Sequence, residues 1–122
     1  MDTERLERLA REALSEGAFA FLSGGAGEEA TVRDNVDAWR RLRLLPRALV
    51  DVSTTSCVTS ILGARFEAPI GVAPMGFHKV AHPSGELATA SAATTTGLLM
   101  VVSTRTSTPL RDVASAMTGR PW

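Results

Sequence analysis

The sequence predicts an α/β protein in which helices and a β-hairpin precede the first two βα units of a parallel (β/α)8 barrel. Two short apolar runs, residues 70–73 and 98–102, are each followed by a helical pattern, as in successive βα units. The runs begin 28 positions apart, close to the roughly 30 residues per unit expected when about 250 residues are shared among eight units. We therefore divide the chain into residues 1–66, which precede the barrel, and residues 67–122, which begin it.

The N-terminal segment is expected to begin with an amphipathic helix. Apolar residues recur at helical spacing within residues 6–14, behind Asp2 or Thr3 as a candidate cap, and predict a helix that runs to about Gly17. The glycine-rich cluster at residues 23–27 suits a turn better than any regular element.

Another helix and a hairpin are expected before the barrel. Val32, Val36 and Trp39 mark one face of the helix. Residues 54–66 are rich in Thr, Val and Ile around a turn residue, Gly63, which predicts a short hairpin.

The remaining residues carry the start and stop signals of two βα units. Residues 82–85 are typical of a helix start, and residues 86–96 carry small apolar side chains toward a C-cap at Gly97. After the second apolar run, Ser107 to Pro109 predict another helix with a hydroxyl cap and a proline in its first turn. A third strand is due at residues 121–122.

Composition argues against a nucleic-acid partner and against a membrane span. Lys and Arg number 13 and Asp and Glu number 13, so no net charge favours a polyanion. Residues 87–104 are uncharged, but hydroxyl side chains crowd them, which favours a soluble helix and a buried strand. The N-terminus lacks the apolar region of a secretory signal. The single cysteine, Cys57, cannot form an internal disulfide, so we expect a cytoplasmic location.

Two segments follow the predicted strands directly, where a βα barrel has its active site. In Pro74, Met75 and Gly76 the proline fixes the backbone and the glycine lets a flat ligand approach main-chain groups. Ser103 adds a hydroxyl after the second strand, and Arg105 adds a guanidinium that could hold a substrate carboxylate. On pattern alone the simpler interpretation is preferred, namely ordinary βα turns and a solvated charge.

Three further patterns are assigned no chemistry. The glycines at residues 24–27 follow a helical stretch and lack phosphate-loop spacing. His78 and His82 are four apart, but Pro83 disfavours a helix there and no carboxylate-rich motif completes a metal site, so we expect no metal. Cys57 is expected on a hairpin strand as a small apolar residue.

Several separate motifs in the same order resemble one flavin-dependent family. Taken together, they resemble the FMN-dependent 2-hydroxy acid oxidases and dehydrogenases, which include glycolate oxidase, lactate oxidase, mandelate dehydrogenase and hydroxymandelate oxidase, over nearly the whole chain. The motifs lie at residues 19–26, Asn35, residues 45–52, 61–63, 68–77, 81–90 and 119–122.

The resemblance implies a (β/α)8 barrel that binds FMN at the C-terminal face of its strands. It implies that Pro74, Met75 and Gly76 contact the flavin ring through the backbone and that Ser103 hydrogen-bonds to it. In this family a histidine takes the hydroxyl proton of a 2-hydroxy acid while hydride passes to flavin N5. That histidine, the carboxylate-binding arginines, a lysine and the phosphate-binding loops belong to later strands, so we expect this chain alone to be inactive. The family also implies a homo-oligomer, a tetramer or an octamer, and pairing with the remainder of the barrel.

Departures from the family pattern concern the substrate more than the flavin. Phe21 falls where many members have a tyrosine that hydrogen-bonds to the substrate carboxylate, and Arg105 falls where an aromatic residue is common. Met75 and Gly76 replace a frequent Thr-Ala, and Ser84 replaces a usual glutamate. We hypothesise that Arg105 partly replaces the missing phenol as a carboxylate anchor.

Two alternatives remain open at the level of sequence. These residues could act as a non-catalytic or complementing piece that binds a partner through its open sheet edge. They could also belong to another FMN barrel, such as a type 2 isopentenyl diphosphate isomerase, although His82, Pro83 and the Arg-Pro-Trp ending favour the hydroxy acid family.

Overall fold

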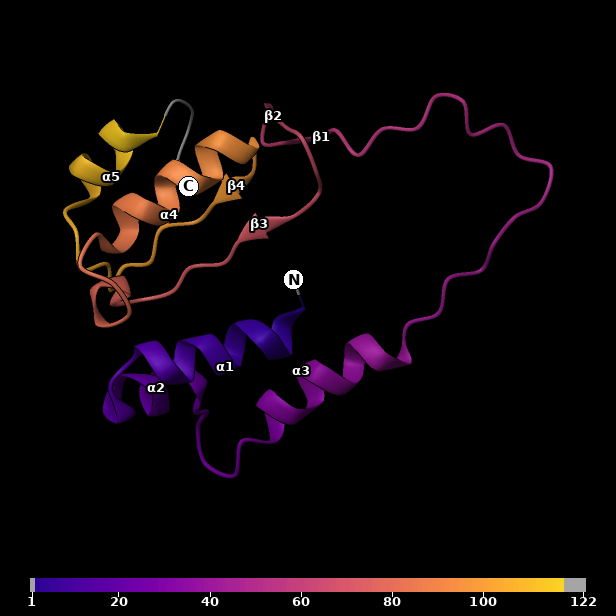
Figure 1. Ribbon diagram of the computed structural model, residues 1–122. Helices are drawn as coiled ribbons and strands as arrows, with labels where there is room; N and C mark the ends of the chain where they lie inside the picture. Colours follow the sequence, from indigo (N-terminus) through magenta and orange to yellow (C-terminus); the bar gives the residue numbers. More distant parts are fainter. Residues whose placement is uncertain (1, 118–122) are drawn as a thin grey trace. The chain divides into compact units, whose positions relative to one another are not determined.

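A computed structural model of the chain describes residues 2–117. The chain forms two compact units, one that extends to Val52 and one that begins at Ser53. Each unit has its own secondary structure (Figure 1). The units are described separately.

The first unit begins with two helices. Helix α1 spans Thr3–Ala13, and helix α2 spans Glu16–Ser23. The predicted extension to Gly17 is wrong, because Leu14 and Ser15 adopt extended backbone angles between the helices. The Ser15 hydroxyl accepts a hydrogen bond from Ala18 N, so it caps α2 and starts a new helix direction.

The two helices pack through one aromatic ring. Phe19 is buried, and the Arg11 guanidinium lies 4.1 Å from the centroid of its ring. This arrangement combines apolar burial with a cation–π contact. At the other end of α1 the Asp2 carboxylate accepts from Arg5 N, as expected for a cap.

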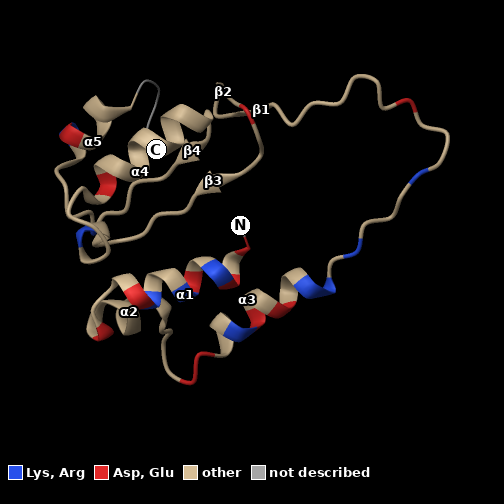
Figure 2. Cartoon of the chain, in the orientation of Figure 1, with Lys and Arg blue, Asp and Glu red and all other residues tan. Residues whose placement is uncertain are grey.

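The glycine-rich cluster forms a turn, as predicted, and leads into helix α3, Ala30–Arg41. Gly25 N donates to the Glu29 carboxylate at 3.0 Å, which closes the turn. Helix α3 carries charges of both signs, including the exposed pairs Arg40–Asp37 and Arg41–Asp34 (Figure 2). Residues 42–52 then form no helix or strand and contain a turn at residues 48–49.

The second unit begins with the predicted hairpin. Strand β1, Thr59–Ile61, pairs antiparallel with β2, Ala64–Phe66, and Gly63 takes a φ of 79° in the turn between them. The prediction for Cys57 is wrong, because β1 begins two residues later and the thiol is exposed.

The two apolar runs form a parallel pair, as predicted. Strand β3, Gly71–Val72, aligns with β4, Leu99–Met100, in the register Gly71 to Leu99 and Val72 to Met100. A bond from Val101 N to Val72 O at 3.0 Å extends the pairing. Successive βα units therefore lie side by side.

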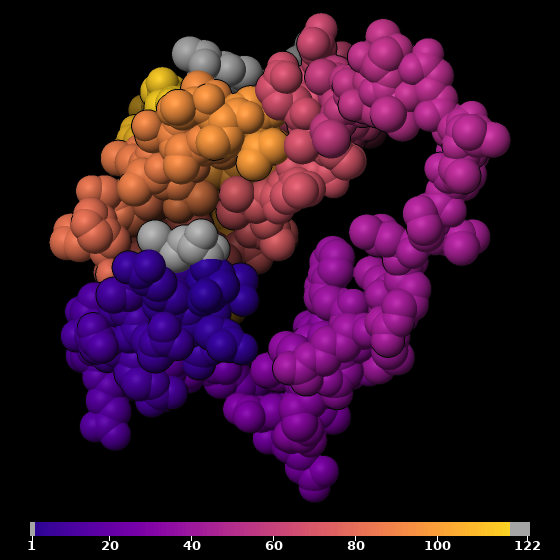
Figure 3. All heavy atoms as spheres, turned by 45° about the vertical axis from the view of Figure 1, so that its right-hand side comes forward, coloured from indigo at the N-terminus to yellow at the C-terminus, as the bar shows by residue number. Residues whose placement is uncertain are grey.

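Helices cover one side of this pair. A short 3-10 helix, η1, spans His78–Val80, α4 spans Gly85–Thr96 and α5 spans Leu110–Ala116. Figure 1 shows α4 lying beside both β4 and α5, and in Figure 3 the orange and yellow atoms of this region form one packed body. The core consists of buried Ala90, Ala93, Met100 and Val113.

The C-terminal end of α4 agrees with the prediction from sequence, whereas the N-terminal cap of α5 does not. Gly97 ends α4 in the left-handed conformation, as predicted. The predicted hydroxyl cap of α5 is wrong, because Pro109 occupies the N-cap position and the Thr108 hydroxyl donates to Glu86 instead.

Among residues 2–117 no helix has the length and apolarity needed to cross a bilayer. The predicted third strand at residues 121–122 lies outside the described part of the chain.

Candidate functional site

The segments that follow β3 and β4 meet at the carboxyl ends of the strands. Phe77 N donates to Arg105 O at 3.1 Å, which joins the two segments directly. Five of the six candidate residues, all except Phe21, belong to these segments. Parallel strands place their following loops at the same edge, where α/β proteins bind ligands.

Gly76 allows this close approach. A Cβ atom on Gly76 would lie 2.9 Å from Arg105 Cβ and 3.3 Å from Arg105 O. Phe77, the next residue, has a φ of 58°, a left-handed conformation that is costly for a residue with a side chain. The segment after β3 is therefore held in an unusual backbone path against the segment after β4.

We call residues 74–77 and 103–105, which follow β3 and β4, the rim. The rim has hydrogen-bonding groups that no described residue occupies. Within residues 2–117 the backbone N–H groups of Met75 and Gly76 donate to no other residue. The half-buried Ser103 hydroxyl accepts from Arg105 N at 3.1 Å, and no described residue accepts its proton. A flavin ring has several carbonyl and nitrogen acceptors along one edge, so these donors fit an isoalloxazine system.

Arg105 presents an exposed side chain at the same rim. Its backbone is engaged on both sides, but in the described part of the chain no acceptor is bonded to its guanidinium. The side chain is therefore free to bind an anion such as a carboxylate. Phe21 belongs to the other unit, on α2, where its side chain is 57% exposed.

Glu86 is a buried carboxylate that the sequence did not single out. It lies in the first turn of α4 with 1% of its surface exposed. Its Oε1 accepts from Ser107 N at 2.7 Å and from His78 N at 3.3 Å, and Oε2 accepts from Thr108 Oγ1 at 2.7 Å. The Ser107 hydroxyl lies 2.9 Å and 2.8 Å from the two oxygens.

These contacts determine the charge of the group. Burial raises the pKa of Glu86, but the hydrogen bonds from Ser107 N, Thr108 Oγ1 and Ser107 Oγ outweigh burial, and the net pKa lies far below the ordinary value. Glu86 is therefore an ionised carboxylate inside the second unit.

The two histidines do not converge on a common ligand position. His78 is buried and its Nδ1 lies 3.0 Å from Thr89 Oγ1, whereas His82 Nδ1 accepts from Ser84 N. No cluster of three or more His, Cys, Asp or Glu side chains suited to a metal occurs within residues 2–117.

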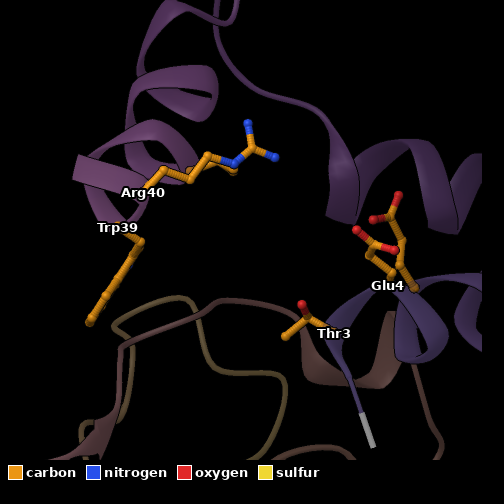
Figure 4. A pocket seen from close by; sticks show the side chains of 6 residues that line it. Thr3, Glu4, Trp39 and Arg40 are labelled. Atoms are coloured by element: carbon orange, nitrogen blue, oxygen red, sulfur yellow. The ribbon is translucent and has the colours of Figure 1, made fainter. Parts of the chain in front are cut away.

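A separate hollow of about 850 Å³ lies in the first unit between α1 and α3. Figure 4 shows Thr3 and Glu4 on one side and Trp39 and Arg40 on the other. It combines an apolar helix face with solvated charges. We assign it no chemistry.

Comparison with known protein families identifies the family of the chain. The model of the family described as FMN-dependent dehydrogenase matches residues 10–122. The chain belongs to this family. The predicted membership is thereby confirmed.

Several curated relatives of this chain are named as 2-hydroxy acid oxidases. Peroxisomal (S)-2-hydroxy-acid oxidase of Oryza sativa subsp. indica is 44% identical over 116 residues, which are 95% of this chain and 32% of the relative. L-lactate oxidase of Nostoc sp. is 45% identical over 108 residues, 88% of this chain and 30% of the relative. The 4-hydroxymandelate oxidase of Amycolatopsis orientalis is 40% identical over 117 residues, 96% of this chain and 32% of the relative.

Solved structures of mandelate oxidase share the fold. One such structure matches with a TM-score of 0.92 and 39% identity over 98% of this chain and 36% of the other. Another, which contains an FMN adduct, matches with a TM-score of 0.91 and 39% identity over 97% of this chain and 36% of the other. The chain thus matches the N-terminal third of a TIM-barrel enzyme, which confirms the predicted fold class. It spans about a third of the length of the curated relatives it matches.

Proposed function

We propose that this chain forms the N-terminal third of an FMN-dependent enzyme that oxidises a 2-hydroxy acid to a 2-oxo acid. The observation that carries the proposal is the parallel pair β3–β4 with available donors at its carboxyl edge, in a chain that belongs to the FMN-dependent dehydrogenase family. Bound FMN would supply the acceptor for the hydride that leaves the substrate α-carbon.

The residues of this chain would bind and orient the flavin and the substrate. Met75 and Gly76 would donate backbone N–H groups to the flavin ring, with Pro74 fixing the chain before them. The Ser103 hydroxyl would donate to the same ring. Arg105 would bind the substrate carboxylate, and Phe21 would contact the substrate without a hydroxyl to hydrogen-bond.

The remaining parts of the proposal concern partners. A two-stranded parallel sheet has open edges, so these residues would pair with the remainder of the barrel. Assembly as a homo-oligomer, the absence of nucleic-acid or membrane partners and a cytoplasmic location stay predictions. The rice relative carries the word peroxisomal in its name, which makes the location a separate question for experiment.

The decisive experiment uses the full-length protein, meaning the complete polypeptide that carries these residues. Purified protein is mixed without oxygen with lactate, glycolate or mandelate, and loss of the oxidised flavin absorbance is recorded. We expect at least one 2-hydroxy acid to bleach the flavin, and admission of oxygen or an added acceptor to restore it. A flavoprotein that no 2-hydroxy acid reduces would refute the proposal and favour another FMN barrel. The relatives named above are oxidases, which supports oxidation over isomerisation.

A further inference from the structure

The Glu86 carboxylate joins the two segments that follow β3 and β4. His78 N, two residues after Gly76, donates to it, and so do Ser107 N, Ser107 Oγ and Thr108 Oγ1, which follow Arg105. Lys79 N in turn donates to Ser107 Oγ at 3.1 Å. One side chain of α4 therefore connects both segments from below the rim.

All the described donors to this carboxylate are neutral backbone N–H or hydroxyl groups. An ionised carboxylate accepts at every lone pair, and hydrogen bonds to a charged group are shorter and stronger than neutral ones. The arrangement therefore depends on both oxygens of Glu86. A glutamine would present an amide N–H₂ group where one oxygen now accepts.

The backbone above Glu86 needs such a restraint. Phe77 adopts the left-handed conformation between Gly76 and His78, and such residues persist where their surroundings hold them. Gly85, also left-handed, leaves room for the Lys79 side chain, because a Cβ atom there would lie 2.8 Å from Lys79 Cγ. The start of α4 is thus packed closely under the segment after β3.

We propose that Glu86 is a positioning residue for the flavin: by holding residues 77–79 to residues 107–108, it sets the spacing between the backbone of residues 74–76 and Ser103. The inference rests on the proposed function. Glu86 lies behind the rim and acts through the two segments, without a contact to the cofactor.

The test compares Glu86→Gln and Thr108→Val with wild-type full-length protein. Thr108→Val replaces the hydroxyl that donates to Glu86 with a methyl group of similar size, and it keeps the carboxylate. This variant therefore remains informative if Glu86→Gln folds poorly. The first measurement is the Kd of the flavin-free protein for added FMN. We expect an increase of about tenfold or more for Glu86→Gln, the effect of losing one charge-assisted hydrogen bond.

The second measurement is amide hydrogen exchange at Phe77 in the flavin-free protein. Phe77 N donates to Arg105 O, a bond that runs directly between the two segments, so its exchange reports the spacing of the two segments. We expect faster exchange at Phe77 in both variants. If Glu86 affected only the groups that donate to it, the exchange rate at Phe77 would be the same in the variants as in the wild type.

Two control variants separate this effect from general destabilisation. Thr95→Val removes a hydroxyl of α4 that donates only to Ser91 O, and Glu12→Gln neutralises an exposed carboxylate of α1. Both are expected to retain the wild-type Kd and exchange.

The outcomes are distinct. Wild-type Kd in Glu86→Gln or Thr108→Val, with or without faster exchange at Phe77, overturns the role of Glu86 while the proposed function stands. A wild-type protein that binds no FMN overturns the proposed function, and the positioning role with it. Weaker FMN binding together with faster exchange, in the variants alone, supports the inference.

Discussion

Arg105 uses its backbone and its side chain for different purposes. Its carbonyl accepts from Phe77 N and its N–H donates to Ser103 Oγ, whereas its guanidinium is exposed at the rim. Replacing the side chain therefore leaves the contact between the two segments in place. The proposed role of the guanidinium in substrate binding can therefore be tested while the backbone contact is kept.

If the proposed function holds, we expect Arg105→Ala in the full-length protein to lower kcat/KM for the 2-hydroxy acid that the protein oxidises by about ten- to a hundredfold, since a hydrogen-bonded charge contributes roughly 1.5–3 kcal/mol. Arg111→Ala, which removes an exposed guanidinium from α5, serves as the control and should have no effect. Steady-state kinetics with each accepted substrate provides the measurement. Unchanged kcat/KM for all of them would show that the carboxylate is bound elsewhere.

Two glycines should respond to alanine in opposite directions. At Gly76 an added Cβ meets Arg105 Cβ at 2.9 Å, so Gly76→Ala is expected to destabilise the protein by about 1–3 kcal/mol through overpacking. At Gly17, in the first turn of α2, the space within 4 Å is open, so Gly17→Ala should stabilise by up to about 1 kcal/mol. Urea denaturation of the two variants measures the sign of each change in the free energy of unfolding. Equal shifts in one direction would contradict the packing described at Gly76.

Glu86 should make stability depend on pH in the acid range. Because its folded pKa lies below the ordinary value of about 4.3, the unfolded chain takes up the proton first as pH falls. The stabilisation is complete above about pH 5 and declines as pH falls toward the folded pKa. Wild-type protein should therefore lose unfolding free energy more steeply below about pH 5 than Glu86→Gln does. Parallel curves would mean that Glu86 does not contribute in this way, and Glu12→Gln should follow the wild-type curve.

Sequence reasoning could suggest the rim residues but not the network beneath them. Pro74 to Gly76 and Ser103 follow apolar runs directly, so their place at strand ends can be predicted from order alone. Glu86 looks like a carboxylate at a helix start, which is common at the surface. Its partners Ser107 and Thr108 stand 21 and 22 positions away and resemble a helix cap. Only the folded backbone brings these groups together.

At the scale of elements, the break between α1 and α2 depends on one hydroxyl. Ser15 Oγ accepts from Ala18 N at 3.3 Å. We expect Ser15→Ala to destabilise α2 by about 0.5–2 kcal/mol and to speed amide exchange at Ala18, because the first turn loses its cap. Ser15→Asp, which retains an acceptor, should restore the wild-type rate. Slow exchange at Ala18 in Ser15→Ala would indicate that packing of Phe19 alone holds the helix.

The elements that sequence predicted well are those with strong local signals. Gly97 ended α4 where it was expected, and Gly63 marked the hairpin turn. The boundary at Leu14 was missed because apolar residues continue through it at helical spacing, and the cap at Ser15 is a weaker signal than that periodicity. The cap of α5 was assigned to Ser107 and Thr108 because a local pattern cannot reveal a competing acceptor elsewhere in the fold.

For the whole molecule, the extent of the sheet limits what the 122 residues can do alone. Two parallel strands provide part of a rim, and the sheet pairs with nothing beyond β3 and β4 among the described residues. We expect the isolated chain to bind FMN weakly and to oxidise no 2-hydroxy acid, since most cofactor contacts of a barrel would come from other strands. Fluorescence titration of FMN with the isolated chain measures this. Stoichiometric, tight binding would contradict it.

A backbone hydrogen bond joins the residue after the hairpin to the end of α4. Glu67 N donates to Gly97 O at 2.9 Å, and a Cβ atom on Gly97 would lie 2.5 Å from Glu67 Cγ. The contact between Glu67 and Gly97 therefore fixes the length of the chain directly after Phe66. The turn at Leu62 and Gly63, in contrast, is exposed, and no atom of the described chain beyond the adjoining residues lies within 4 Å of a Cβ placed on Gly63. Extra residues would be accommodated at the hairpin tip and rejected after Phe66, so a peptide tag for labelling belongs at the tip.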